Sequence, residues 1–391
     1  MWLVAIVAVL LAVAVWCLWT AVLPRDSRSA DERLAEIEAA RAIPDSENAA
    51  MIYNELLQDP NAASVLSYCP EFLEPPIFNQ VRDKPWLGKD HPELVGWIKG
   101  HQYISDRLLE ASRLEKCRFP ISIDLTDMSQ MNRAAPMRQW GFLLSMVANN
   151  DLAEGRIDGA MAKWQCILRM GSHLRQQPML IDHLVASALE EVALKSMARF
   201  VVTGDATESH LQAIEAMPLP TKDSWAEHRK AIRSVEDLRS QKVMEPFGPL
   251  DRLRYHVVSF RMKRAVNSAT GGMLNQSPLD ESGYQCRRPI ATARGIRILV
   301  ALKRHKTATN HWPQSLDEIK SSLSEEILTD PLNKGPFVYK PAGGTFTLYS
   351  KGENNIDENG RWEPEAGADD WPIWPLRGRS AEPERQDANG V

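Results

Sequence analysis

An uncharged apolar run opens the chain. Residues 2–23 contain no charged side chain, and the run ends before Arg25. At about 1.5 Å of rise per residue, a helix of this length spans about 33 Å, which is enough to cross a hydrocarbon core about 30 Å thick. Trp16 and Trp19 lie near one end, where indole rings favour the membrane interface. The pattern therefore predicts a transmembrane anchor over residues 1–24.

A cleaved signal peptide is the alternative interpretation of this run. Signal peptides have a basic first segment, a shorter apolar core and a cleavage site flanked by small residues. No Lys or Arg precedes this run, and Trp16-Cys17-Leu18-Trp19 is a poor cleavage neighbourhood. We therefore favour an uncleaved anchor that contacts the lipid bilayer through residues 2–23. No later stretch of about 18 apolar residues follows, so the sequence predicts a single-pass protein.

Helical periodicity dominates residues 31–267. Gly155 separates two of the strongest helical segments, which predicts an antiparallel hairpin. Residues 69–92 contain five prolines and are expected to be irregular, because proline lacks a backbone donor and restrains the residue before it. The pattern predicts an all-α body of helical hairpins. Its predicted helices are residues 31–42, 47–58, 94–116, 137–154, 157–175, 179–202, 211–217, 225–242 and 251–266.

The pattern changes after residues 268–288, which contain Gly271-Gly272 and are expected to be a linker. The segment 289–376 begins with an apolar helical run. Ser315-Leu316-Asp317-Glu318 follows as a capping box, which predicts a short helix to about Leu323. β-favouring residues on both sides of Gly343-Gly344 predict a hairpin. The expected fold class is thus mainly α, with a transmembrane helix, an all-α body and a small α+β C-terminal module; residues 377–391 are expected to be a disordered tail.

The composition and net charge of the chain bear on whether it binds nucleic acid. The chain has 391 residues, of which 44% are hydrophobic and 25% charged, as in ordinary globular proteins. A net charge of −5 gives no reason to expect a nucleic-acid partner, because phosphate binding needs a concentrated basic face. One locally basic segment, residues 252–264, is expected to be a solvated helix face, with a membrane-surface or anionic-partner role as the alternative.

Five cysteines are spread widely along the chain. They form no CxxC pair, which argues against zinc-ribbon and thioredoxin-like sites. Cys17 lies inside the apolar run. A disulfide among the other four is left open by the sequence, which does not say which residues would pair: Cys69, Cys117, Cys166 and Cys286.

No common catalytic motif is present, including HExxH, GxxxxGK[ST], GxSxG and GxGxxG. The nearest candidate for acid–base or metal chemistry is the group His173, Asp182 and His183, close to Glu190-Glu191. The structural alternative, which we favour, is that these are polar positions on amphipathic helices. Two tryptophans, Trp140 and Trp164, are expected to pack in the core rather than to hold a cofactor.

The order of features in residues 289–376 resembles the C-terminal half of the major pseudopilin of type II secretion systems. The residues that carry the resemblance are Asn310 to Glu318, Asp330-Pro331, Gly335 to Tyr339, Thr345 to Ser350 and Asp369 to Pro372. The membrane helix lies far upstream of this segment, beyond the helical body, so the chain is not a standard pseudopilin. As a whole it is similar to membrane proteins of planctomycete-type bacteria that join a helical body to a pseudopilin-like end.

In the pseudopilin family the loop after the hairpin binds calcium. The resemblance places Ser350-Lys351-Gly352 at the turn that begins this loop. Its side-chain ligands would be Glu353, Asn354, Asp357 and Asp369 or Asp370. Oxygen-rich flexible loops suit calcium, although Asn354 stands where the family has a carboxylate. An EF-hand is excluded because Ala366 occupies its twelfth position. A solvated loop without metal remains the alternative.

Two hypotheses of function follow. The first is a membrane-anchored scaffold of the cell envelope, with a protein partner on the helical body. The second is an enzyme whose site lies around His173, Asp182 and His183. Arg25 and Arg28 after the anchor would place the body in the cytoplasm. The pseudopilin resemblance implies an extracytoplasmic body, which we favour. The sequence identifies no substrate.

Overall fold

A computed structural model describes residues 28–124, 126–127, 132–248, 251–252, 254 and 278–376. Several predicted features lie outside the described residues: the anchor at 2–23, most of the basic segment 252–264, the first part of the linker at 268–277 and the tail at 377–391. Among the helices that the structure does describe, none is both long enough and apolar enough to cross a membrane.

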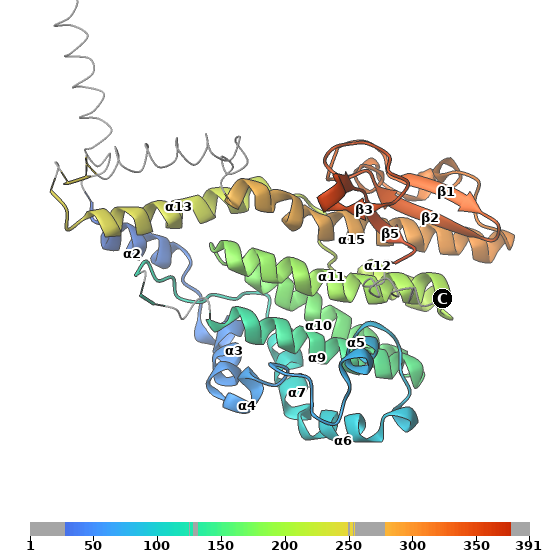
Figure 1. The fold of residues 1–391 in the computed structure, drawn as a ribbon, viewed down its shortest axis with the longest axis horizontal. Coiled ribbons are helices and arrows are strands. Elements are labelled where there is room, and N and C mark those ends of the chain that lie inside the picture. The colour runs from blue at the N-terminus through green and yellow to red at the C-terminus, as the bar shows by residue number, and fades with distance from the viewer. Residues whose placement is uncertain are drawn as a thin grey trace, which may run out of the picture.

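The body is mainly helical in its described residues, as predicted (Figure 1). The described residues of the body contain one isolated β-bridge, between Asn48 and Lys116. The helices are α2 (Ala30–Ala40), α3 (Ala49–Gln58), α4 (Pro60–Ala63), α5 (Pro75–Asp83), α6 (Pro92–Gly100), α7 (Gln102–Ala111), α9 (Ala134–Ala153), α10 (Ile157–Arg175), α11 (Leu180–Thr203), α12 (Glu208–Ala216) and α13 (Trp225–Met244).

The centre of the body is the hairpin of α9 and α10, with α11 packed against both (Figure 1). Gly155 makes the turn with a φ of 75°, a left-handed conformation that glycine adopts without a steric cost. Trp140 on α9 and Trp164 on α10 are fully buried, which confirms their predicted place in the core. The indole of Trp140 donates to the carbonyl of Ala62 at 2.8 Å and so ties α4 to the hairpin.

Two predictions about the segment before the hairpin are wrong. Residues 94–116 do not form one helix: α6 ends at Gly100 and α7 ends at Ala111. Glycine is a weak helix former, and the next residue, His101, turns its ring back to hydrogen-bond the carbonyl of Trp97 at 2.8 Å. The proline-rich residues 69–92 are not wholly irregular either, since Pro75 and Pro76 begin α5. Proline is tolerated in the first helical turn, where its missing N–H would have no helical partner.

Part of the predicted linker is helical. Helix α15 runs from Pro278 to Thr309, so residues 278–288 belong to it. Pro278 lies within the predicted linker, but it stands at the first position of this helix, where proline is compatible with helical φ. The helix packs along α11, and buried residues of both helices belong to one hydrophobic core. In the described residues the C-terminal module is therefore continuous with the body.

A small antiparallel sheet covers α15 (Figure 1). Its strands β1 (Val338–Ala342), β2 (Thr345–Ser350) and β5 (Trp371–Trp374) lie in the order β1-β2-β5. The β1–β2 pair is the predicted hairpin, with Gly343 and Gly344 at positive φ in its turn. A second pair, β3 (Trp362–Glu363) and β4 (Ala368–Asp369), lies in the loop before β5.

The predicted capping box is present with different hydrogen-bond partners. Ser315 accepts from the backbone N–H of Asp317, and the Glu318 carboxylate accepts from the N–H of Gln314, one residue earlier than expected. The segment is two 3-10 turns, Leu316–Glu318 and Lys320–Ser322, rather than an α-helix to Leu323. The short α16 (Glu325–Leu328) follows.

Candidate functional site

His173 is held by two structural hydrogen bonds. Its Nδ1 lies 2.9 Å from the hydroxyl of Tyr53, and its Nε2 lies 2.9 Å from the carbonyl oxygen of Leu114. The ring is fully buried, and burial lowers the pKa of His173 to about 4. The neutral ring on α10 is thus hydrogen-bonded to Tyr53 of α3 and to Leu114, which follows α7. These contacts account for His173 as a structural residue.

Asp182 and His183 have different partners. The carboxylate of Asp182 is paired with Arg133, whose Nε lies 3.0 Å from Oδ1. The Nε2 of His183 lies 2.9 Å from the backbone oxygen of Gln177. Within the described residues no hydrogen bond joins His173, Asp182 and His183. All three are polar positions on helices, and all three are buried rather than exposed to solvent. Each sits where a hydrogen-bond partner from another segment compensates the loss of water.

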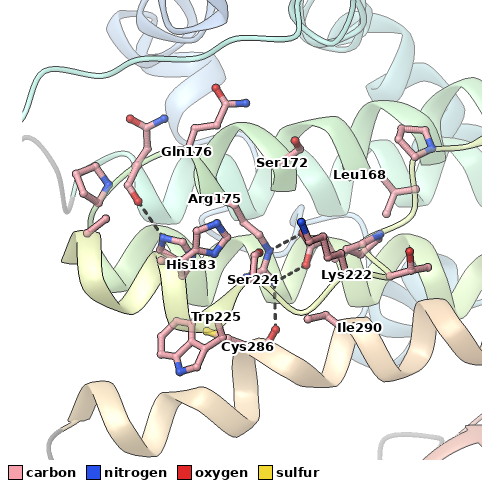
Figure 2. A pocket seen from close by; sticks show the side chains of 18 of the residues that line it. Leu168, Ser172, Arg175, Gln176, His183, Lys222, Ser224, Trp225, Cys286 and Ile290 are labelled. Atoms are coloured by element: carbon pink, nitrogen blue, oxygen red, sulfur yellow. Dashed lines mark hydrogen bonds and ion pairs between the residues drawn. The ribbon is translucent and has the colours of Figure 1, made fainter. Parts of the chain in front are cut away.

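The structure places His183 on the wall of a cavity that the sequence did not predict. This central cavity has a volume of about 830 Å³ and lies between α2, α10, α11, α13 and α15 (Figure 2). Residues 218–224, which connect α12 to α13, form one side of it. Its size falls within the range of sites that hold small organic molecules. The walls come from residues 37–41, 168–190, 218–235 and 286–290, so no single local motif could have revealed the cavity.

A buried ion pair lies across the cavity wall. Arg175 donates through Nε to Glu190 Oε1 at 2.9 Å and through Nη2 to Oε2 at 2.6 Å (Figure 2). The same Nη2 reaches the backbone oxygen of Cys286 on α15. Gly171 makes room for this arrangement, because a Cβ there would lie 2.8 Å from the Cγ of Glu190. Glu190, the only carboxylate among the described lining residues, is thus already neutralised by a cation.

The other polar groups of the lining include a lysine, two histidines and serines. Lys222 is exposed at the rim and has no ion-pair partner in the part of the chain that the structure describes. His228 stacks against His183 with ring centroids 4.7 Å apart. Burial, followed by the charge effects of His228 and Arg175, lowers the pKa of His183 to about 3. Ser172 and Ser224 also line this space.

The other part of the lining is apolar. Leu168 comes from α10, Trp225 and Val235 from α13, and Ile290 from α15. Trp225 is held against α15 at Gly283, where a Cβ would lie 2.9 Å from the indole Nε1. The cavity therefore combines an apolar wall with a polar wall that carries more positive than negative groups. Sequence periodicity marked several of these residues as core positions, but periodicity does not distinguish a filled core from a lined cavity.

The described cysteines are unpaired. Cys117, Cys166 and Cys286 are buried and Cys69 is partly buried, and none of these four forms a disulfide. Burial raises the pKa of Cys166 to about 12 and raises that of Cys286. A thiol in such surroundings is a poor nucleophile, because the thiolate is the reactive form.

The five predicted calcium ligands are described, and they do not meet at one point. Glu353 forms an ion pair with Arg287 at 2.9 Å. Asp357 accepts from the Tyr349 hydroxyl at 2.6 Å and pairs with Lys340 at 3.0 Å. The Tyr349 hydrogen bond is the main cause that lowers the pKa of Asp357.

The other three stabilise the loop itself. Asn354 accepts from the N–H of Ile356 at 2.7 Å. Asp369 accepts from the N–H groups of Glu353 and Asn354. Gly352 permits this approach, because a Cβ there would lie 2.2 Å from Asp369 Oδ1. Asp370 is fully buried and accepts from the N–H of Gly360 at 2.7 Å.

Three carboxylate oxygens in this region are buried without a hydrogen-bond partner among the described residues. They belong to Glu358, Asp369 and Asp370. The carboxyls of Glu358 and Asp370 are in contact; burial, with the nearby Glu358, raises the pKa of Asp370 to about 7. No set of three or more His, Cys, Asp or Glu side chains in the described part of the chain is arranged to hold a metal ion. The region supplies oxygens suited to calcium, and Glu358 joins the predicted residues.

Comparison with protein families, with curated proteins and with solved structures found no match to this chain.

Proposed function

We propose that this protein is a single-pass, membrane-anchored scaffold of the cell envelope, with an extracytoplasmic helical body that binds a protein partner. The anchor is the uncharged run at residues 2–23. Its end is separated by only residues 24–29 from α2. Asp31 on α2 pairs with Lys242 on α13, and the backbone N–H of Ala30 donates to Glu245 at 2.7 Å. These contacts support a body held close to the bilayer surface rather than on a long tether.

The observation that carries the scaffold role is the distribution of exposed apolar side chains. Seven large hydrophobic residues are exposed in the described chain, and five of them lie between residues 51 and 103. Exposed apolar side chains that gather on one part of a surface indicate a protein interface more often than scattered ones do. The five are Met51, Tyr68, Phe72, Val95 and Tyr103, all from the segment that runs from α3 to α7, and we take this segment as the partner face.

Photo-crosslinking in native membranes tests the proposal. A photoreactive amino acid would replace Tyr68, which is 88% exposed, or Ile356, which is exposed on the C-terminal loop and serves as the control. Membranes washed with alkaline carbonate should retain the full-length chain. We expect one discrete crosslinked partner from position 68 and none from position 356. Release of the chain by carbonate, or equal diffuse crosslinking from both positions, would contradict the anchored scaffold.

The enzyme hypothesis has weaker support in the described residues. Its three candidate side chains are separately engaged: His173 with Tyr53, Asp182 with Arg133 and His183 with the Gln177 carbonyl. A general base needs to reach the proton that it removes, directly or through one water. Buried imidazoles whose hydrogen bonds run to the protein's own framework suit a structural role better.

For the C-terminal module we propose a pseudopilin-like fold stabilised by calcium. Its support is the resemblance together with the buried oxygens of Glu358, Asp369 and Asp370 that lack partners in the described chain. Glu358 would replace Glu353 and Asp357 as a ligand, since these two already pair with Arg287 and Lys340. A hard cation would compensate the proximity of the carboxyls, and calcium tolerates the irregular geometry of such a loop.

A further inference from the structure

The central cavity has the charge balance of a site for an anion. The only carboxylate among its described lining residues, Glu190, is paired with Arg175 at 2.6 Å. The hydrogen bonds of Arg175 run through Nε and Nη2, which leaves Nη1 without a partner among the described residues. Lys222 adds a second positive charge at the rim without a described ion-pair partner. A guanidinium donor together with an ammonium group favours a carboxylate over a neutral polar group.

His183 adds a requirement for a hydrogen-bond donor. Its Nε2 faces the Gln177 carbonyl, so in the neutral ring Nε2 carries the proton and Nδ1 is an acceptor. That Nδ1 is buried and has no hydrogen-bond partner in the described structure, although the side chain is only 1% exposed. Buried polar atoms are usually satisfied. An N–H or O–H group of a bound molecule at this wall would supply the missing donor.

The apolar wall indicates the rest of the ligand. Leu168, Val235, Ile290 and the ring of Trp225 face the cavity, and its volume of about 830 Å³ is large enough for a drug-sized molecule. A purely inorganic anion would leave this surface without contacts. A neutral apolar molecule would leave Arg175 Nη1 and Lys222 without partners.

We propose that the central cavity is a binding site for an apolar organic acid whose carboxylate lies close to an N–H group, such as an acylated amino acid or the carboxyl end of an apolar peptide. The carboxylate lies between Arg175 and Lys222, the N–H donates to His183 Nδ1, and the apolar part packs against Leu168, Ile290 and Trp225. None of the five residues of the partner face lines the cavity, so the site does not depend on the scaffold role.

Calorimetric titration of the full-length protein in a nonionic detergent tests this site. The probes are N-acetyl-L-phenylalanine, its neutral carboxamide, and 3-phenylpropionate, which keeps the carboxylate and lacks the N–H. We expect the carboxamide to bind at least about tenfold more weakly than the acid, equivalent to about 1.4 kcal/mol. 3-Phenylpropionate should lie between the two. A longer peptide ending in phenylalanine, added as a fourth probe, distinguishes the two sources: tighter binding than the acetylated residue identifies a peptide end, and weaker binding identifies a free acid.

Two variants locate the site. Lys222→Gln removes the rim charge and should weaken binding of the acid about tenfold while leaving binding of the carboxamide unchanged. Lys230→Gln is the matched control, since Lys230 is exposed on α13 but does not line the cavity. Ser172→Trp should fill the cavity and abolish binding of every probe, with helical circular dichroism as the check on folding. Equal affinity for acid and carboxamide, or an unchanged affinity in both Lys222→Gln and Ser172→Trp, would overturn the proposal.

Discussion

At the scale of single residues, the buried histidines differ from what their sequence positions suggested. His173 and His183 looked like candidates for chemistry because imidazole titrates near neutral pH. Burial instead keeps both rings neutral, with the pKa of His173 at about 4 and that of His183 at about 3. Their hydrogen bonds, to Tyr53, Leu114 and Gln177, come from segments distant in sequence or from the backbone. A sequence pattern does not reveal such partners, and the choice between a catalytic and a structural histidine depends on them.

This burial predicts a loss of stability in mild acid. An unfolded histidine has a pKa near 6.5, so between about pH 6.5 and 4 the unfolded chain binds more protons than the folded one. The histidine contribution to the free energy of unfolding is therefore fully present above pH 6.5 and decreases as the pH falls. Denaturant titrations at pH 7.5 and 5 should show that His173→Gln loses less stability over this interval than the original chain. Identical slopes for His173→Gln and the original chain would contradict the assignment.

At the scale of elements, local pattern predicted helices well wherever the periodicity was unbroken. Helix α10 begins at Ile157 and ends at Arg175, as predicted, and the β1–β2 hairpin forms around Gly343-Gly344. The predicted helix boundaries were wrong at prolines and at a polar side chain, where contacts with the rest of the fold determine whether a helix begins or ends. Pro75 and Pro278 begin helices instead of ending them, and His101 interrupts one. The central cavity was beyond prediction from sequence because its walls come from α2, α10, α11, α13 and α15.

The contact between α15 and β5 predicts a strongly position-dependent effect of glycine substitution. A Cβ on Gly295 would lie 2.5 Å from Ile373 Cδ1, so Gly295→Ala should force the helix and strand apart and destabilise the protein by about 1–3 kcal/mol. Gly96 in α6 is the matched control, since a Cβ there meets no atom within 4 Å. Gly96→Ala should stabilise the helix by about 0.5–1 kcal/mol. Thermal and chemical denaturation of both variants measure the difference, and a Gly295→Ala protein as stable as the original would show that this helix and strand are not so closely packed.

The loop before β5 predicts a response to calcium. Binding to the folded state alone raises stability by about 2.7 kcal/mol when calcium is a hundredfold above its dissociation constant. The melting temperature of the full chain should rise with millimolar calcium and much less with magnesium. Asp370→Asn should remove this rise, whereas Glu353→Gln should preserve it, because Glu353 is already paired with Arg287. If Glu353→Gln abolished the effect and Asp370→Asn did not, the ligand set inferred from the sequence would be right and the rearranged one wrong.

At the scale of the whole molecule, the C-terminal module is not an appendage. The sequence placed a linker at residues 268–288 and so suggested a separate domain after it. In the described residues, α15 instead packs along α11, while Trp371 of β5 donates to Thr292 and Thr292 donates to Glu191 of α11. The sheet, α15 and the helical body therefore share buried surface, and separating them would expose apolar side chains on both sides.

A shared core predicts that body and module unfold together. Ile296 on α15 is fully buried in that core, and Ile296→Ala should cost about 2–5 kcal/mol by removing apolar contacts and leaving a cavity.

Hydrogen exchange in increasing denaturant, followed by mass spectrometry, reports separately on peptides from β2 and from α10. Both should exchange through the same transition, and Ile296→Ala should lower the opening free energy of both by the same amount. Val95→Ala, at a residue that is 40% exposed, should lower neither. If β2 opened at lower denaturant than α10, and Ile296→Ala affected β2 alone, the module would be an independent domain docked on the body. One cooperative unit would instead couple any event at the loop before β5 to the helices that line the central cavity, because α15 contributes to both.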